Sequence, residues 1–266
     1  MLAHRTRTAA ARVAAICLMA TAVTNLAAIG TAEDFRIESK VFLEGQQQPL
    51  AETLTLFSDA VVYDFLLTQP EEIAVFDPRR ERLVLLDVER RQMTTIHMKE
   101  LQELNANLKE KAGGGALAEF IHPQFDEGFD AETGWLTLAG SVVTYRARGS
   151  EAQDEPSSRQ YQQFADWYAR LNAVRPGGLP PFGRIELNAA LARRSLVPEE
   201  VRLSFVVKEA LREKKVELHS AHTVIWNLSR GDRERIEKAK DYLVTYKSVS
   251  FPKYCADTSS PAEEER

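Results

Sequence analysis

The sequence predicts an α+β protein built on a curved antiparallel sheet, an incomplete barrel, that is capped by helices. Between Phe35 and Met98, short apolar runs with a period near two alternate with turn-like segments, which is typical of an antiparallel meander. Amphipathic segments with helical spacing follow after residue 98, and more strand-like runs come after those. Several early strands are apolar on both faces, which indicates that part of the sheet is covered on both sides.

Composition limits the class of protein. The chain has 266 residues, 44% of them apolar and 27% charged, and a formal net charge of −5. These values exclude collagen, a disordered acidic chain and a disulfide-dense miniprotein. The first 32 residues contain arginines but no acid, so the rest of the chain has a more negative net charge than the chain as a whole. Such a charge does not create an electrostatic field that attracts phosphates. We therefore expect no nucleic-acid partner.

Residues 1–32 have the pattern of a secretory signal peptide. A basic head precedes the uncharged core Val13–Val23, and the small residues Gly30-Thr31-Ala32 precede Glu33. The core is short for a bilayer-spanning helix, and an uncleaved N-terminal anchor is the alternative interpretation. We expect an exported protein, periplasmic or extracellular, that is at most peripheral to a membrane. Residues 33–255 should form a single α+β domain, and residues 256–266 a disordered polar tail.

The first strand is expected at Phe35–Leu43, where apolar and charged residues alternate and place one pleated face on a core. Gly45 and Pro49 then break the run. Further strands, separated by short turns rich in Asp, Pro and Glu, are predicted at Thr53–Phe57, Ala60–Leu67, Ile73–Phe76, Arg82–Val88 and Gln92–Met98.

Some of these strands do not alternate. Leu83-Val84-Leu85-Leu86 is apolar at every position, and Val61–Tyr63 and Phe65–Leu67 are nearly so. A sheet with one solvated face would carry a polar residue at every second position. The cover on these strands is either a set of tightly packed helices or the wall of an enclosed space, and the pattern leaves both alternatives open.

Helix signals begin at Lys99, and an amphipathic helix is expected up to the three glycines at 113–115. Ser157 is expected to cap a later helix with an aromatic face, after an acidic loop from Gly149 to Pro156. The other elements predicted in this half are strands at Gln124–Phe129, Trp135–Ala139, Val142–Arg148, Val201–Val207 and Val216–Leu228, and helices at Ile185–Arg194 and Asp232–Tyr242.

No enzyme motif is found in the chain. His219 and His222 lie in a predicted strand, where residues three apart point to opposite faces and cannot share a metal ion. Asp126 and Asp130 lack the spacing of a calcium loop and are interpreted as solvated turn residues, with a hydrolase whose acids meet only in space as a lesser alternative. We expect no catalytic residue, no metal and no cofactor. Once the leader is removed, Cys255 is the only cysteine, so no internal disulfide is expected.

The stretch from residue 53 to residue 96 resembles the periplasmic lipoprotein-carrier (LolA-like) family. The resemblance covers about a fifth of the chain after the leader and implies an incomplete barrel with an apolar cavity for acyl chains. Two turns depart from the family pattern: Asp59-Ala60 stands where the family tends to have Arg-Pro, and Asp77-Pro78 where it has Asp-Gly. The segments that carry the resemblance are Leu54–Phe57, Val62–Phe65, Thr68–Glu72, Val75–Asp77 and Met93–Ile96.

These observations favour a non-enzymatic exported protein that binds an apolar or lipid-like ligand, or a lipidated partner such as a lipoprotein. The alternative is a structural or protein-interaction module of the periplasm or cell envelope, with a filled core and no ligand. The residues predicted to line a cavity are Tyr63, Phe65, Leu67, Leu83, Leu85 and Trp135.

Overall fold

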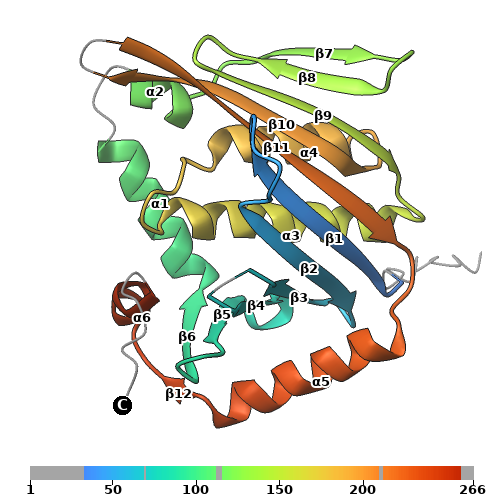
Figure 1. Ribbon diagram of the computed structural model, residues 1–266, viewed down its shortest axis with the longest axis vertical. Helices are drawn as coiled ribbons and strands as arrows, with labels where there is room; N and C mark the ends of the chain where they lie inside the picture. Colours follow the sequence, from blue (N-terminus) through green and yellow to red (C-terminus); the bar gives the residue numbers. More distant parts are fainter. Residues whose placement is uncertain (1–32, 69, 112–115, 210–211, 259–266) are drawn as a thin grey trace, which may run out of the picture. The chain divides into compact units, whose positions relative to one another are not determined.

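The computed structural model in Figure 1 describes residues 33–68, 70–111, 116–209 and 212–258. The predicted signal peptide lies outside the described residues, as does the predicted tail from residue 259 onward. The described residues form one sheet of twelve strands with six α-helices. The sheet is curved and does not close into a barrel, because β12 (Lys247–Ser248) and β7 (Asp126–Asp130) stand at its two edges. The predicted α+β class with an open antiparallel sheet is therefore confirmed.

The first half of the sheet is the predicted meander, in which each strand pairs antiparallel with the next. The predicted strand ends agree with the structure to within two residues. The strands are β1 (Phe35–Leu43), β2 (Ala51–Ser58), β3 (Val61–Leu66), β4 (Glu72–Asp77), β5 (Arg82–Asp87) and β6 (Gln92–His97).

The β2–β3 turn explains one departure from the LolA-like pattern. Ser58 pairs with Val61, and the two residues between them, Asp59 and Ala60, have φ angles of 52° and 65°. Two positive φ values give a two-residue turn that matches the twist of the flanking strands. Proline fixes φ near −65°, so an Arg-Pro pair would not fit this turn at positions 59 and 60.

The second half of the sheet joins the meander through a long hairpin. β11 (Arg212–Ile225) pairs with β1 on one side and with β10 (Leu196–Glu209) on the other, and β10 pairs with β9 (Val143–Glu151). β8 (Trp135–Ala139) and β7 continue the sheet to its edge. At the other edge, the two residues of β12 pair parallel with β6.

Helices cover both faces of the meander (Figure 1). On one face, α3 (Glu155–Ala173), α1 (Met98–Lys111) and α6 (Phe251–Thr258) bury a layer of apolar residues that includes Phe35, Phe57, Phe76 and Leu85. α4 (Phe182–Ala192) extends this layer over β8, β9 and β10, and the short α2 (Ala116–Ile121) contacts α4. We call this the α3 face.

Among the described helices, α5 (Arg230–Thr245) is the one that covers the opposite face of the meander. Ile236 and Ala239 of α5 pack against a second layer of strand residues, among them Leu56, Val75 and Leu86. We call this the α5 face. The sequence left open whether packed helices or an enclosed space covers β3, β4 and β5. Packed helices cover both faces of these strands, and the strand side chains beneath them are almost entirely buried.

Several local boundaries were predicted wrongly, among them the start of β10, which lies at Leu196 and not at Val201. The helix predicted to start after Ser157 begins at Glu155, because the Asp154 side chain accepts a hydrogen bond from the Ser157 amide at 2.6 Å and Pro156 is tolerated in a first helical turn. The predicted acidic loop is accordingly short, since β9 runs to Glu151. The first three residues of the predicted polar tail, 256–258, belong to α6, where Tyr254 is buried against the α3 face.

Candidate functional site

The six residues predicted to line a cavity do not lie together. Tyr63 and Phe65 are buried on the α5 face, whereas Leu83 and Leu85 are buried on the α3 face. Leu67 follows the end of β3 and is 46% exposed. Trp135, on β8, is separated from β3 by five intervening strands.

Strand register explains this separation. Residues directly opposite each other in an antiparallel sheet share a face. Tyr63 faces Val75 across the β3–β4 pair, and Val75 faces Val84, so Val84 shares the face of Tyr63. Leu83 and Leu85, one residue to either side of Val84, point the other way. The sequence showed that these strands are apolar on both faces but did not show which residues share one.

Two of the six, Phe65 and Leu67, line a groove beside α5. It consists of two hollows of about 310 Å³ and 540 Å³, and Leu67 and Arg235 line both. Small-ligand sites have volumes of about 300–1,000 Å³. We call this site the α5 groove. Its apolar lining is Leu54, Phe65, Leu66, Leu67, Ile73, Val88, Ala221, Ala239 and Tyr242.

The start of α5 is fixed by a buried charge, and this sets one end of the groove. Ser229 and Asp232 form a capping box, in which each side chain accepts a hydrogen bond from the backbone of the other. The Arg36 guanidinium of β1 donates to both Asp232 carboxylate oxygens at 3.0 Å. These hydrogen bonds from Ser229 and Arg36 hold the pKa of Asp232 below its usual value despite its burial. Helix α5 is thus tied to the central strand of the sheet.

The helix side of the groove follows from helical spacing. Arg235, Lys238, Ala239 and Tyr242 recur at the intervals that place residues on one side of a helix. Ala239 is small and buried, so the helix backbone lies close to the sheet there. The exposed Leu67 lies where the two hollows meet.

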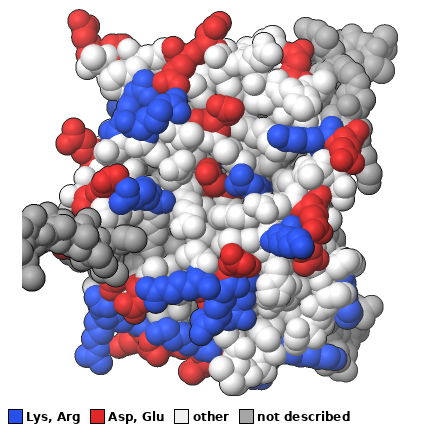
Figure 2. Space-filling view, turned by 180° about the vertical axis from the view of Figure 1, so that it is seen from behind, with Lys and Arg blue, Asp and Glu red and all other residues white. Residues whose placement is uncertain are grey.

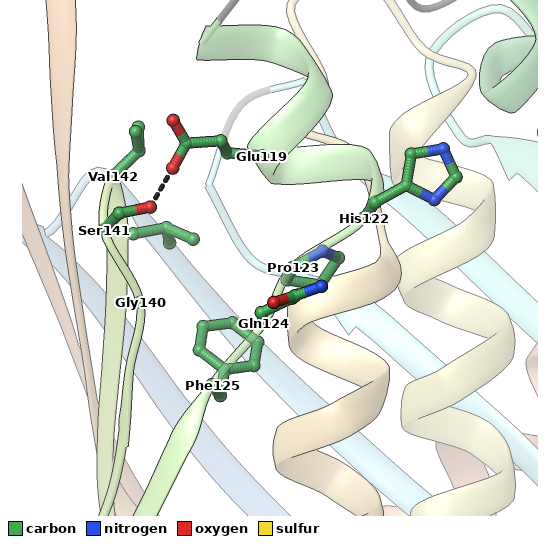
Figure 3. A pocket seen from close by; sticks show the side chains of 9 residues that line it. Glu119, His122, Pro123, Gln124, Phe125, Gly140, Ser141 and Val142 are labelled. Atoms are coloured by element: carbon green, nitrogen blue, oxygen red, sulfur yellow. Dashed lines mark hydrogen bonds between the residues drawn. The ribbon is translucent and has the colours of Figure 1, made fainter.

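A separate hollow of about 250 Å³, away from the α5 groove, lies between α2 and the β8–β9 turn (Figure 3). Ser141, Glu119 and His122 are residue types of a hydrolase triad. The Ser141 hydroxyl donates directly to the Glu119 carboxylate, and the His122 imidazole is exposed and points away from both. A triad needs the imidazole between the hydroxyl and the acid, so these three residues are not arranged as a nucleophile with its base.

Trp135 lies in a cluster of arginines on the α5 face, beyond the cover of α5. The guanidinium carbons of Arg146, Arg202 and Arg148 lie 4.6, 5.1 and 5.6 Å from the centre of an indole ring. Glu200 pairs with Arg148 at 3.1 Å and with Arg202 at 2.7 Å. Cation–π contacts and this shared carboxylate stabilise an exposed stretch of sheet. On the molecular face drawn in Figure 2, acidic and basic side chains likewise adjoin one another in separate patches, with uncharged surface between the patches.

A buried polar network connects the sheet to α3. Asp64 of β3 is 4% exposed and accepts a hydrogen bond from the Thr55 hydroxyl at 2.6 Å and another from Tyr168. Burial raises the pKa of the Asp64 carboxyl to about 6. Nearby, Glu72 pairs with Arg175 at 2.7 Å and accepts a hydrogen bond from the Tyr254 hydroxyl at 2.9 Å. This network joins β2, β3 and β4 to α3 and α6.

The histidines and aspartates considered for metal binding or acid catalysis do not form a common site. His222 is held by Ser39 and Ser220, at 2.7 and 2.8 Å, and burial lowers its pKa to about 3, while His219 stacks on Phe42 on the other face of β11. Asp126 and Asp130 are exposed, and hydrogen bonds from Thr133 and the backbone lower the pKa of Asp130. An acid catalyst requires the opposite shift.

The described part of the chain contains neither a metal-ion cluster nor a helix able to span a membrane. No three His, Cys, Asp or Glu side chains there lie close enough together to hold a metal ion. Among the same residues, no helix combines the length and apolar character that crossing a bilayer requires.

Fold and site together define an α+β protein with an open curved sheet and a partly apolar groove beside α5. Comparison with known proteins adds no family: no family model matches the chain, and no significant match is found among curated proteins.

Proposed function

We propose that this protein is a non-enzymatic binding protein that holds an apolar or lipid-like ligand, or the lipid group of a lipidated partner, in the α5 groove. The observation that carries the proposal is the lining: Phe65, Leu67 and Tyr242 present apolar surface to an open hollow beside α5. Exposure of apolar surface to water is unfavourable in free energy, and a ligand with an apolar chain that covers this surface is therefore stabilised there.

The groove is suited to binding rather than to chemistry. Its buried acid, Asp232, is engaged by Arg36 and by the α5 cap, and Glu72 is engaged by Arg175. A general acid or base instead needs a pKa tuned toward the working pH. The proposal places binding in the periplasm or outside the cell, as the predicted leader indicates. The ligand is placed on the α5 face because buried side chains fill the layer beneath α3.

The first test replaces Leu67 by serine. We expect the variant to bind the neutral apolar probe Nile red about five- to tenfold more weakly than the wild type, because a half-exposed leucine gains up to about 1.5 kcal/mol when a ligand covers it. The measurement is a fluorescence titration. Leu50→Ser is the matched control: Leu50 is 52% exposed and does not line the groove, so its loss should leave the affinity unchanged.

Protein purified from its native compartment should also release a lipid on solvent extraction, seen by mass spectrometry. Protein that is consistently empty and takes up no Nile red would refute the proposal.

A separate observation favours a second candidate function, a protein-interaction module with a filled core. Strand β7 is exposed along its length at the edge of the sheet, and Phe129 within it is 45% exposed. Unpaired edge strands are templates for pairing with another chain. A stoichiometric partner recovered from the exported fraction, and lost when β7 is shortened, would favour this candidate over ligand binding.

A further inference from the structure

Helix α5 carries two kinds of basic residue. Three of them do not line the groove and have acidic partners: Arg230 pairs with Glu234 at 2.9 Å, Arg233 with Asp34 at 2.8 Å, and Lys240 with Glu237 at 2.8 Å. The other two, Arg235 and Lys238, line the groove, and neither has an ion pair with a described residue. Among the basic residues of α5, the two that line the groove are thus the two without an ion pair to a described residue.

The acids of the groove do not supply the missing partners. Four of its five acidic residues are taken up by other bases, Arg36, Lys40 and Arg175. Glu71 is the fifth and has no basic partner among the described residues. Arg36 serves two of these carboxylates, so the five acids are matched in number by five bases and the groove with its ion-pair partners has no net charge. Arg235 and Lys238 are distinguished instead by being two cations on one helix without a carboxylate bound to either, among the described residues.

The positions of the two cations relative to the apolar lining define a ligand. Arg235 and Lys238 are three residues apart and so lie on one side of the helix. Arg235 borders both hollows, as Leu67 does, and Lys238 lies over the Tyr242 ring with its Nζ 5.6 Å from the ring centre. The cations therefore border the apolar lining instead of standing apart from it.

We infer that the α5 groove takes an anionic amphiphile, whose apolar chain lies on Phe65, Leu67 and Tyr242 and whose carboxylate or phosphate head is bound by Arg235 and Lys238. This inference rests on the proposed function and adds the charge of the ligand to it. A guanidinium and an ammonium on one helix side are donors for either head.

The test compares three amphiphiles with the same twelve-carbon chain and different heads, by calorimetry below their micelle concentrations. Dodecanoate is the anion, dodecyltrimethylammonium the cation and dodecyl maltoside the neutral form. We expect wild-type protein to bind dodecanoate about tenfold more tightly than the cation at low salt. The preference should shrink in 0.5 M NaCl, because exposed charges are screened.

The double variant Arg235→Gln/Lys238→Gln should lose most of this preference. Arg230→Gln/Arg233→Gln is the matched control, since it removes the same charge from the same helix outside the groove and should keep the preference. Inorganic phosphate at millimolar concentration should not displace dodecanoate.

The outcomes separate the two proposals. Equal affinity for all three amphiphiles, or equal loss in both double variants, would overturn the inference while leaving apolar binding in place. Displacement by phosphate alone would overturn it in favour of a site for free anions. Failure of every amphiphile to bind would overturn the proposed function itself.

Discussion

Replacing Phe57 by alanine should lower the free energy of unfolding by about 3–5 kcal/mol, the range found for large aromatic residues removed from cores. Phe57 of β2 is fully buried at the centre of the α3 face. Its ring stacks on Phe35 with centres 4.0 Å apart and meets the edge of Phe164 of α3 at 5.8 Å. The change therefore removes contacts between two strands and a helix at once and leaves a cavity that the sheet cannot close.

Urea unfolding followed by circular dichroism measures this loss. Phe129→Ala makes the same change on a ring that is 45% exposed at the sheet edge, and should cost below about 1 kcal/mol. A Phe57→Ala protein as stable as Phe129→Ala would mean that the α3 face is not a rigid packed layer, and the filled core described above would be wrong.

This layer also shows how far the sequence predicts the fold. The alternation along Phe35–Leu43 and the all-apolar run at Leu83–Leu86 depend only on which residues of each strand are buried. The strands, and the cover on both faces of the sheet, could therefore be predicted from the sequence. Pairing partners are set by hairpin geometry, which a pattern within one strand does not contain. For this reason Leu83 and Leu85 were assigned to the face of Tyr63, which they do not share.

The α5 groove was only partly predictable for a related reason. Phe65 and Leu67 were predicted to line a cavity because they belong to a strand segment that is apolar on both faces and to the stretch that resembles the LolA-like family, and both line the groove. Arg235, Lys238 and Tyr242 come from a helix about 170 residues later in the chain, and nothing in their own segment indicates which strands α5 covers. The spacing of Arg235, Lys238 and Tyr242 shows that they share one side of a helix. It does not show that this side lies next to Phe65, which only the structure reveals. The helix α6 was missed because eight residues contain too few turns for a periodic pattern.

The stability of the protein should fall as the pH rises from 4 to 7.5, by up to about 3 kcal/mol from Asp64 alone. Burial raises the pKa of Asp64 to about 6 in the folded state, against an ordinary value of 3.8. A carboxyl with a raised folded pKa stabilises the fold fully below its unfolded pKa, and this contribution is lost as the pH rises through the folded pKa. The loss should therefore centre between pH 4 and 6. Asp64→Asn keeps the side chain neutral, so its unfolding free energy should lack this part of the pH dependence.

Thr55→Val tests the cause of the shift, since the other groups that face Asp64 remain in place. The Thr55 and Tyr168 hydrogen bonds and the Arg175 charge lower the pKa of Asp64, whereas burial and the Glu72 charge raise it. Removing the Thr55 hydroxyl should raise the pKa further, and the pH-dependent loss of stability should extend to higher pH. Urea unfolding between pH 4 and 8 provides the comparison. Parallel curves for wild type and Asp64→Asn would show that this carboxyl is not held out of water between β3 and α3, because only a desolvated acid makes the fold less stable as it ionises.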